Sequence, residues 1–269
     1  MRKFLRAAMR AANAVLRPIN LAIVHGNPAR EWRHASTPDI SHQKVLPHAT
    51  YSPWLDDQDF RRCYEAIRQH TLVDIYRCYE LWQLGHQLAG LGGSFLEVGV
   101  WRGGTGCLLA RAAISGFSAP ARSSAWSGRG ATVYLADTFT GVVKAGPDDT
   151  VYTGGEHADT SEQTVRDLAA GLGLENIHIL RGVFPDDTAE AIREQLALVH
   201  CDVDVYSSAR AVAEWALPRL LPGGVIVFDD YGFSGCEGVT KLVNELRGRE
   251  GLRFVHNLNG HALLVKLAD

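Results

Sequence analysis

The sequence predicts an α/β protein with a mostly parallel sheet of seven strands and helices on both of its faces. Two observations lead to this fold class. Short apolar runs alternate with helical segments from Ser94 onward, which is the pattern of repeated strand and helix units. Near the end of the chain, two further runs flank Asn259-Gly260, a hairpin signal. The sheet should therefore be parallel over most of its width and end in an antiparallel pair.

The first 24 residues are basic and amphipathic. They contain five basic residues and no acidic one, and their apolar residues recur at roughly helical spacing. Arginines interrupt each apolar run well short of the roughly 20 residues of a spanning helix, and no signal-peptide cleavage site follows. Two interpretations stay open: a helix on an anionic membrane surface, and a packing or oligomerisation helix that ends at Pro18. We expect a cytoplasmic protein, peripheral at the inner face of the membrane under the first interpretation.

The rest of the chain divides by its hydrophobic pattern. We expect a basic helix and linker arm over residues 1–56, two lead-in helices that cover the core over 57–92, and the main domain over 93–269. Residues 187–197 should form one of the connecting helices of that domain. Two loops are unusually long, 118–130 and 138–160, and the second is long enough to be an active-site lid.

Composition narrows the classes of partner. The formal net charge of -3 supplies no overall basic field, so we expect no nucleic acid partner and favour a small molecule. The five cysteines are far apart and form no CxxC pair. This usage indicates reduced thiols rather than a zinc site or a disulfide framework.

A glycine-rich turn follows the first strand of the main domain. The strand carries Glu97, and the glycines at 99, 103, 104 and 106 let the backbone approach a ligand closely. Their spacing departs from the GxGxxG pattern of dinucleotide sites, and an acidic residue here suits a ligand with an ammonium or sulfonium charge better than a pyrophosphate. Asp137 closes the second strand, where a carboxylate often binds ribose hydroxyls. The alternative is a structural turn that binds nothing.

Four aspartates stand at the ends of two predicted strands: Asp202, Asp204, Asp229 and Asp230. The first two share one face of an extended chain, and the second two can fan toward one point at a bend. Converging carboxylates without histidine or cysteine favour a hard cation, with magnesium ahead of calcium and manganese. The alternative is that Asp204 and Asp230 cap the helices that follow them. We expect the preceding His200 to support the acids or the core rather than to bind metal.

Five stretches resemble the macrocin O-methyltransferase family, in the expected order: "FLEVGVWRGGTG", "DTFTG", "HCDVDVYSS", "LLPGGVIVFDDYG" and "GCEGV". The similarity runs from about Thr71 to Lys266, and its aspartate motifs are more specific than its glycine turn. The resemblance implies a Rossmann-like class I methyltransferase that uses S-adenosylmethionine and Mg²⁺ or another divalent cation to methylate sugar hydroxyls. The N-terminal arm and the loop 118–130 have no counterpart in this pattern.

The resemblance also implies roles for individual residues. Metal ligands fall on Asp202, Asp229 and Asp230, and a general base falls on Asp204 beside Asp202. Cofactor contacts fall on Thr71, Glu97, Gly99, Arg102, Gly103, Asp137, Phe139 and Ser161.

Three functions therefore compete. The first is metal-dependent O-methylation of a vicinal diol in a glycosylated natural product or a surface glycan, in which the cation lowers the pKa of one hydroxyl and Asp204 accepts its proton. The second uses a catechol, whose two oxygens would satisfy the same cation. The third is a noncatalytic subunit that binds the cofactor or a partner. We expect a homo-oligomer, with contact to a membrane through residues 1–24 as an open interpretation.

Overall fold

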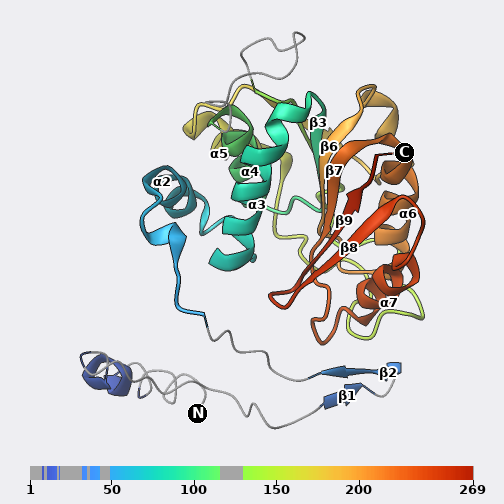
Figure 1. Ribbon diagram of the computed structural model, residues 1–269, viewed down its shortest axis with the longest axis horizontal. Coiled ribbons are helices and arrows are strands. Elements are labelled where there is room, and N and C mark those ends of the chain that lie inside the picture. Colours follow the sequence, from blue (N-terminus) through green and yellow to red (C-terminus); the bar gives the residue numbers. More distant parts are fainter. Residues whose placement is uncertain are drawn as a thin grey trace.

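The computed structural model describes residues 49–115 and 130–268, together with residues 8, 11–16, 18, 32–34 and 37–42. Its main body is a seven-stranded sheet in the order β5-β4-β3-β6-β7-β9-β8 with helices on both faces (Figure 1). Neighbouring strands from β5 to β7 are parallel, and β9 is antiparallel to both β7 and β8. The predicted fold class is therefore confirmed. The strands are β3 (Ser94–Val98), β4 (Val133–Asp137), β5 (Ile177–Arg181), β6 (Leu196–Cys201), β7 (Leu220–Phe228), β8 (Leu252–Asn257) and β9 (His261–Lys266).

Two buried clusters lie on opposite faces of the sheet. Because side chains alternate along a strand, Phe95 of β3 joins one cluster and Leu96 joins the other. The first cluster packs against helices α2 to α5 and the second against α6 and α7. All five residues of β3 are buried, as expected of a parallel strand covered on both faces. The core helices are α4 (Gly104–Ser115), α5 (Glu162–Gly171), α6 (Tyr206–Ala216) and α7 (Glu237–Leu246).

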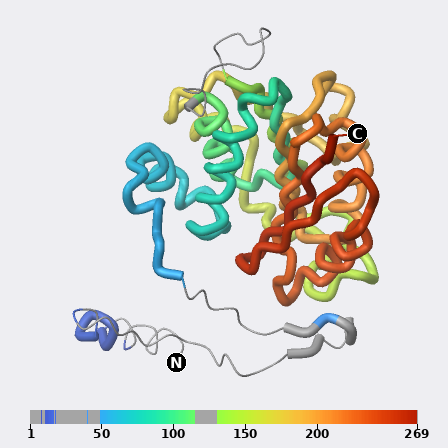
Figure 2. Tube along the Cα trace, viewed as in Figure 1, coloured from blue at the N-terminus to red at the C-terminus, as the bar shows by residue number. Residues whose placement is uncertain are grey.

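The two lead-in helices are α2 (Gln58–Ile67) and α3 (Ile75–Leu88), and both pack against α4 (Figure 2). Asp57 caps α2 by accepting a hydrogen bond from Phe60 N, and its second oxygen accepts one from the indole of Trp82 on α3. Asp74 caps α3 through the backbone N–H groups of Tyr76 and Arg77. The expected helices over one face of the sheet are thus present, and a side-chain N-cap stabilises the start of each.

The helix predicted over residues 187–197 is wrong. The structure has a single 3-10 turn, Ala189–Ala191, and β6 already begins at Leu196. The carboxylate of Asp187 accepts a hydrogen bond from Val183 N, and that of Glu194 accepts one from Arg193 N. Such local side-chain bonds compete with helix formation at both ends of the segment.

The N-terminal region falls largely outside the described residues. Within it, residues 11–16 are helical, and an antiparallel pair, β1 (Trp32–His34) and β2 (Thr37–His42), occurs where the sequence predicts a linker. The predicted loop 118–130 also lies outside the described residues, apart from residue 130. Among the helices described, none is long and apolar enough to cross a membrane.

Candidate active site

A cavity of about 250 Å³ lies at the carboxyl ends of β3, β4, β6 and β7. Parallel sheets bind ligands at this edge. Seven of the residues predicted to form the site line it: Thr71, Gly99, Asp137, Asp202, Asp204, Asp229 and Asp230. Five others lie outside its wall: Glu97, Arg102, Gly103, Phe139 and Ser161. The structure thus gathers all four aspartates and part of the predicted cofactor set in one place.

Gly99 is the point where the glycine turn meets the strand that carries the acids. Its φ of 88° lies in the left-handed region, and a Cβ here would stand 1.6 Å from the carbonyl oxygen of Asp202. Asp202 N in turn donates to Val98 O at 2.9 Å. A side chain at position 99 would therefore force the ends of β3 and β6 apart.

Asp137 holds the glycine turn in shape. Its Oδ2 accepts hydrogen bonds from Val100 N at 2.7 Å and Trp101 N at 2.9 Å, while Oδ1 accepts one from Phe139 N at 2.6 Å. Trp101 needs this support because it has a positive φ of 45° without being glycine. The carboxylate predicted to bind ribose thus also orders the backbone around it.

Thr71 reaches the cavity because the chain before α3 passes over the start of α4. Gly104 N donates to His70 O at 2.9 Å, and a Cβ on Gly104 would lie 2.6 Å from that oxygen. Thr71 Oγ1 accepts a hydrogen bond from Val73 N. Ser161 has a structural task as well, since it caps α5 through Thr164 N.

Glu97 is fully buried and faces away from the cavity toward α4. Its Oε1 lies 2.8 Å from Nδ1 of the equally buried His200, and a Cβ on Gly106 would lie 2.6 Å from its Oε2. His200 thus contacts Glu97, and its supporting role stays a prediction. Its Nε2 lacks a hydrogen-bond partner among the described residues.

The acid cluster consists of Asp202 at the end of β6 and of Asp229 and Asp230 at the end of β7. One carboxylate oxygen from each lies within 4.8 Å of the others. Asp204 and Asp230 have φ values of 63° and 62°, a strained conformation for residues other than glycine, and such strain is concentrated at functional sites. The backbone is thus bent so that these side chains converge.

Capping does not account for these aspartates. At α6 the N-cap is Val205, whose side chain makes no cap, and Tyr206 N donates instead to Asp149 Oδ1 at 2.9 Å. At α7 the N-cap is Cys236, again without a side-chain cap. The alternative roles of Asp204 and Asp230 as helix caps are therefore wrong.

The pKa of Asp229 is shifted in the opposite direction from those of Asp202 and Asp230. Burial and the charges of the other acids raise the pKa of Asp202 and of Asp230 well above the ordinary value. Burial also acts to raise the pKa of Asp229, but His261 and Arg77 outweigh it and hold that pKa well below its usual range. Asp229 is the acid whose charge the protein itself compensates.

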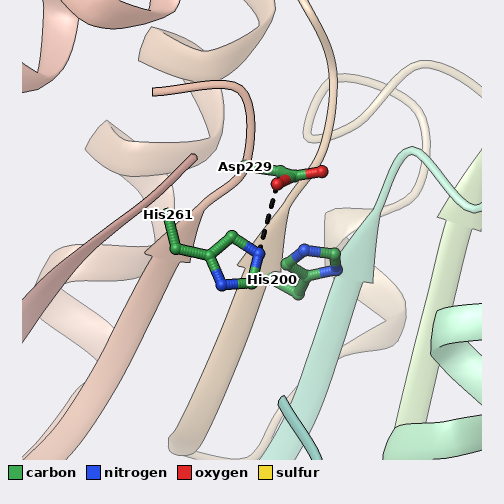
Figure 3. Close-up of side chains that lie close together, drawn as sticks. All are labelled: His200, Asp229 and His261. Carbon is green, nitrogen blue, oxygen red and sulfur yellow. Dashed lines mark ion pairs between the residues drawn. The ribbon is translucent and has the colours of Figure 1, made fainter. Parts of the chain in front are cut away.

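Two further groups of possible ligands share residues with this cluster. One joins Asp204 and Asp230 to Cys236, and the other joins Asp229 to His200 and His261 (Figure 3). In the second group, His261 Nε2 already lies 3.1 Å from Asp229 Oδ1 as an ion pair. The three carboxylates remain the set that a hard cation prefers, and Asp230 Oδ2 is buried without a hydrogen-bond partner among the described residues. The residues present fit a divalent cation.

Sequence reasoning missed Arg77, which lines the cavity from α3. It is 6% exposed and forms ion pairs with Asp229 and with Asp74. The segment "LVDIYRCYELW" also carries Asp74 and Glu80, so no local signal marked Arg77 as a buried charge. Its partner Asp229 lies 152 positions away.

The predicted lid, residues 138–160, forms one wall of the cavity. Tyr152 and His157 line the cavity together with Asp204. Burial, and then the charge of Asp204, raise the pKa of Tyr152. The far end of the segment is fastened at Asp159, which accepts hydrogen bonds from Trp101 Nε1 at 2.8 Å and Arg102 Nη2 at 2.7 Å.

This fold, with a ligand cavity at the glycine turn of its first parallel strand, is that of a class I methyltransferase. The solved structure of the O-methyltransferase NovP shares it with a TM-score of 0.60 and 24% identity, over 74% of this chain and 83% of that chain. Residues 67–255 match the family described as macrocin O-methyltransferase. The chain belongs to this family and is an S-adenosylmethionine-dependent O-methyltransferase.

Curated relatives agree with this assignment. Mycinamicin III 3''-O-methyltransferase of Micromonospora griseorubida is 32% identical over 196 residues, which cover 68% of this chain and 72% of that protein. Demethyldecarbamoylnovobiocin O-methyltransferase of Streptomyces niveus is 28% identical over 193 residues, covering 67% of this chain and 68% of that protein. An enzyme is thus established, and the noncatalytic alternative is set aside.

Proposed function

We propose that this enzyme methylates a hydroxyl of a vicinal diol on the sugar of a glycosylated natural product, with a divalent cation held by Asp202, Asp229 and Asp230. The observation that carries the proposal is the convergence of these three carboxylates at the edge of the cavity, with one oxygen of each within 4.8 Å of the others. The two curated relatives are named as methyltransferases of mycinamicin III and of demethyldecarbamoylnovobiocin, and these names support a natural product as acceptor.

The glycine-turn side of the cavity would hold S-adenosylmethionine. Thr71, Gly99 and Asp137 line it there, and the backbone of the turn is ordered by the Asp137 carboxylate. Two of the residues outside the wall would contribute indirectly. Arg102 binds Asp159 of the loop 138–160, and Glu97 on β3 contacts His200 on β6. Phe139, Gly103 and Ser161 stay predictions as direct cofactor contacts.

The acid side would bind the cation and the acceptor. Mg²⁺ suits a set of oxygen ligands without nitrogen or sulfur. A bound divalent cation lowers the pKa of a coordinated hydroxyl and can orient two neighbouring oxygens. A bound cation would give the buried Asp230 oxygen a partner. It would also lower the pKa values of Asp202 and Asp230, which burial and mutual repulsion raise.

Asp204 would accept the proton of the reacting hydroxyl. Burial raises its pKa, and the hydrogen bond from Tyr152 and the charge of His157 act in the opposite direction. A carboxylate with a raised pKa is a stronger base than an exposed one, which suits general-base catalysis near neutral pH. Tyr152 would orient the carboxylate, and the loop 138–160 would keep water away from the transferring methyl group.

The test is methyl transfer measured by mass spectrometry. Purified enzyme and S-adenosylmethionine are offered a set of glycosylated macrolides and aminocoumarins, surface-glycan oligosaccharides and a catechol, each in chelator and after Mg²⁺ is restored. We expect the gain of one methyl group on a sugar diol, only when the cation is present. Transfer that is undiminished in chelator would refute the role of the cation, and transfer to catechol alone would refute the sugar acceptor.

The assembly and location of the enzyme are also proposals. We infer a cytoplasmic homo-oligomer, and the basic segment 1–24 supports contact with an anionic membrane surface. Light scattering after gel filtration measures the mass of the assembly. Co-sedimentation with anionic liposomes, compared with a chain that lacks residues 1–24, tests the membrane contact, and equal binding by both proteins would refute it.

A further inference from the structure

Asp229 is contacted by two buried side chains, the guanidinium of Arg77 and the imidazole of His261. The guanidinium of Arg77 forms an ion pair with its Oδ1, and His261 Nε2 lies 3.1 Å from the same oxygen (Figure 3). Arg77 is 6% exposed, and His261 and Asp229 are 0% and 2% exposed. Both contacts fall on one oxygen, so the rotation of the carboxylate is restricted while Oδ2 takes part in neither.

The ring of His261 is itself fixed by Glu80. Nδ1 of His261 lies 2.7 Å from Glu80 Oε2, which also accepts a hydrogen bond from Asn259 Nδ2 at 3.0 Å. The other oxygen of Glu80 accepts a hydrogen bond from Asn257 Nδ2. The hairpin of β8 and β9 therefore binds both oxygens of Glu80, and Glu80 in turn fixes the orientation of the His261 ring.

Helix α3 carries both Arg77 and Glu80. Arg77 and Glu80 are three positions apart, so they lie on the same face of the helix. Arg77 contacts Asp229 directly, and Glu80 reaches it through His261. A covering helix, a β-hairpin and the end of β7 thus meet at a single carboxylate oxygen.

We propose that Glu80 and His261 are positioning residues for the cation site, which present Oδ2 of Asp229 toward Asp202 and Asp230. The inference rests on the proposed cation. A ligand carboxylate binds an ion more tightly when its other oxygen is held, because less freedom is lost on binding. Partners of metal ligands typically contribute about 10- to 100-fold in metal affinity. A merely structural tie between α3 and the hairpin would leave that affinity unchanged.

The test is the affinity of the cofactor-free protein for Mn²⁺, measured by calorimetry and by the electron paramagnetic resonance of free Mn²⁺. Glu80→Gln keeps the size of the side chain and removes its charge. We expect it to weaken Mn²⁺ binding about 10-fold or more and to leave the affinity for S-adenosylmethionine unchanged. Glu194→Gln is the matched control, because Glu194 is hydrogen-bonded to Tyr134 just before β6 begins, at the opposite edge of the sheet. It should bind Mn²⁺ as the wild type does.

A second variant guards against loss of folding. Asn259→Ala removes one donor to Glu80 and the side-chain acceptor of His261 N, and it leaves every charge in place. We expect a smaller decrease in Mn²⁺ affinity in the same direction. Thermal unfolding in chelator reports the stability of each variant separately. If the variants bind Mn²⁺ with wild-type affinity, whatever their stability, the positioning role is refuted and the cation site stands. If the wild type itself binds no Mn²⁺, the cation proposal fails and this inference fails with it.

Discussion

The cavity wall at the ends of β3 and β4 differs in chemistry from the wall at the ends of β6 and β7. At the ends of β3 and β4, the wall includes Gly99, Val100 and Trp101. One carboxylate, Asp137, accepts hydrogen bonds from the backbone N–H groups of Val100, Trp101 and Phe139. At the ends of β6 and β7, the wall carries four carboxylates, two of them on strained backbone. We infer that the first half depends on volume and backbone conformation, whereas the second half depends on charge.

The largest effect is expected when the acid half loses a carboxylate. Asp229→Ala and Asp230→Ala should each abolish cation-dependent methyl transfer, but they should differ in stability. Asp229→Ala removes one of the two carboxylates that Arg77 and His261 each contact, and breaking a buried pair costs about 3–5 kcal/mol. Asp230→Ala removes a charge that its neighbours repel, so the unfolding free energy in chelator should stay the same or rise.

Urea unfolding in chelator and the methyl-transfer assay together check this pair. The comparison fails if Asp230→Ala is destabilised as much as Asp229→Ala, because burial alone would then decide the cost. Retained activity in either variant would remove that carboxylate from the cation site.

The next effect tests the glycine-turn half through its volume. Gly99→Ala should lower the unfolding free energy by more than about 2 kcal/mol, since a left-handed φ costs an L-residue about 1–2 kcal/mol and the new Cβ would overlap the Asp202 carbonyl. Gly173→Ala is the control, with a φ of 63° and no atom within 4 Å of the new Cβ. Equal losses in urea unfolding would show that the close approach at Gly99 is unimportant.

The carboxylate that orders the turn tests the same half of the cavity through cofactor binding rather than through volume. Asp137→Ala leaves three backbone N–H groups without their acceptor, each loss costing about 1–3 kcal/mol if the group stays buried. We expect weaker binding of S-adenosylmethionine in calorimetry and unchanged binding of Mn²⁺. Asp167→Ala, which removes only an exposed contact with Gln163 on α5, should change neither. A loss of Mn²⁺ binding in Asp137→Ala would mean that the two halves do not act separately.

The smallest effect concerns the surface contact that closes the loop 138–160 onto the turn. Asp159→Ala removes the partners of Trp101 and Arg102, and exposed pairs contribute about 0–1 kcal/mol. The KM for S-adenosylmethionine should rise by up to about 5-fold. Asp148→Ala breaks an ion pair of the same loop with Lys241, where neither residue lines the cavity, and should leave KM unchanged. An equal KM in both variants would exclude the Asp159 contact from cofactor binding.

Local signals were sufficient for most of the fold. Apolar runs predicted the strands, and Asn259-Gly260 predicted the antiparallel pair, because strand burial and turn geometry depend on neighbouring residues. The helix over residues 187–197 was wrong, since side-chain bonds of Asp187 and Glu194 to nearby backbone groups are not visible in a periodic pattern. Tertiary context overrides propensity in such short connections.

The candidate site could be predicted only in part. The position of the aspartates at strand ends was enough to bring them together, because parallel strands end at the same edge of a sheet. Their partners were not predictable. Arg77 lies on a helix 152 positions before Asp229, and Asp149 rather than Asp204 binds the start of α6.

The sequence by itself determined the strands, the glycine turn and the four acids at one edge, since each follows from residues that are adjacent along the chain. Only the tertiary structure decided which of the four acids lies against Arg77 and His261. The strand order places β9 beside β7, so that His261 reaches Asp229 and, from α3, Arg77 and Glu80 join it. Burial and charge depend on neighbours in space, and for Asp229 these neighbours come from segments far away in the sequence.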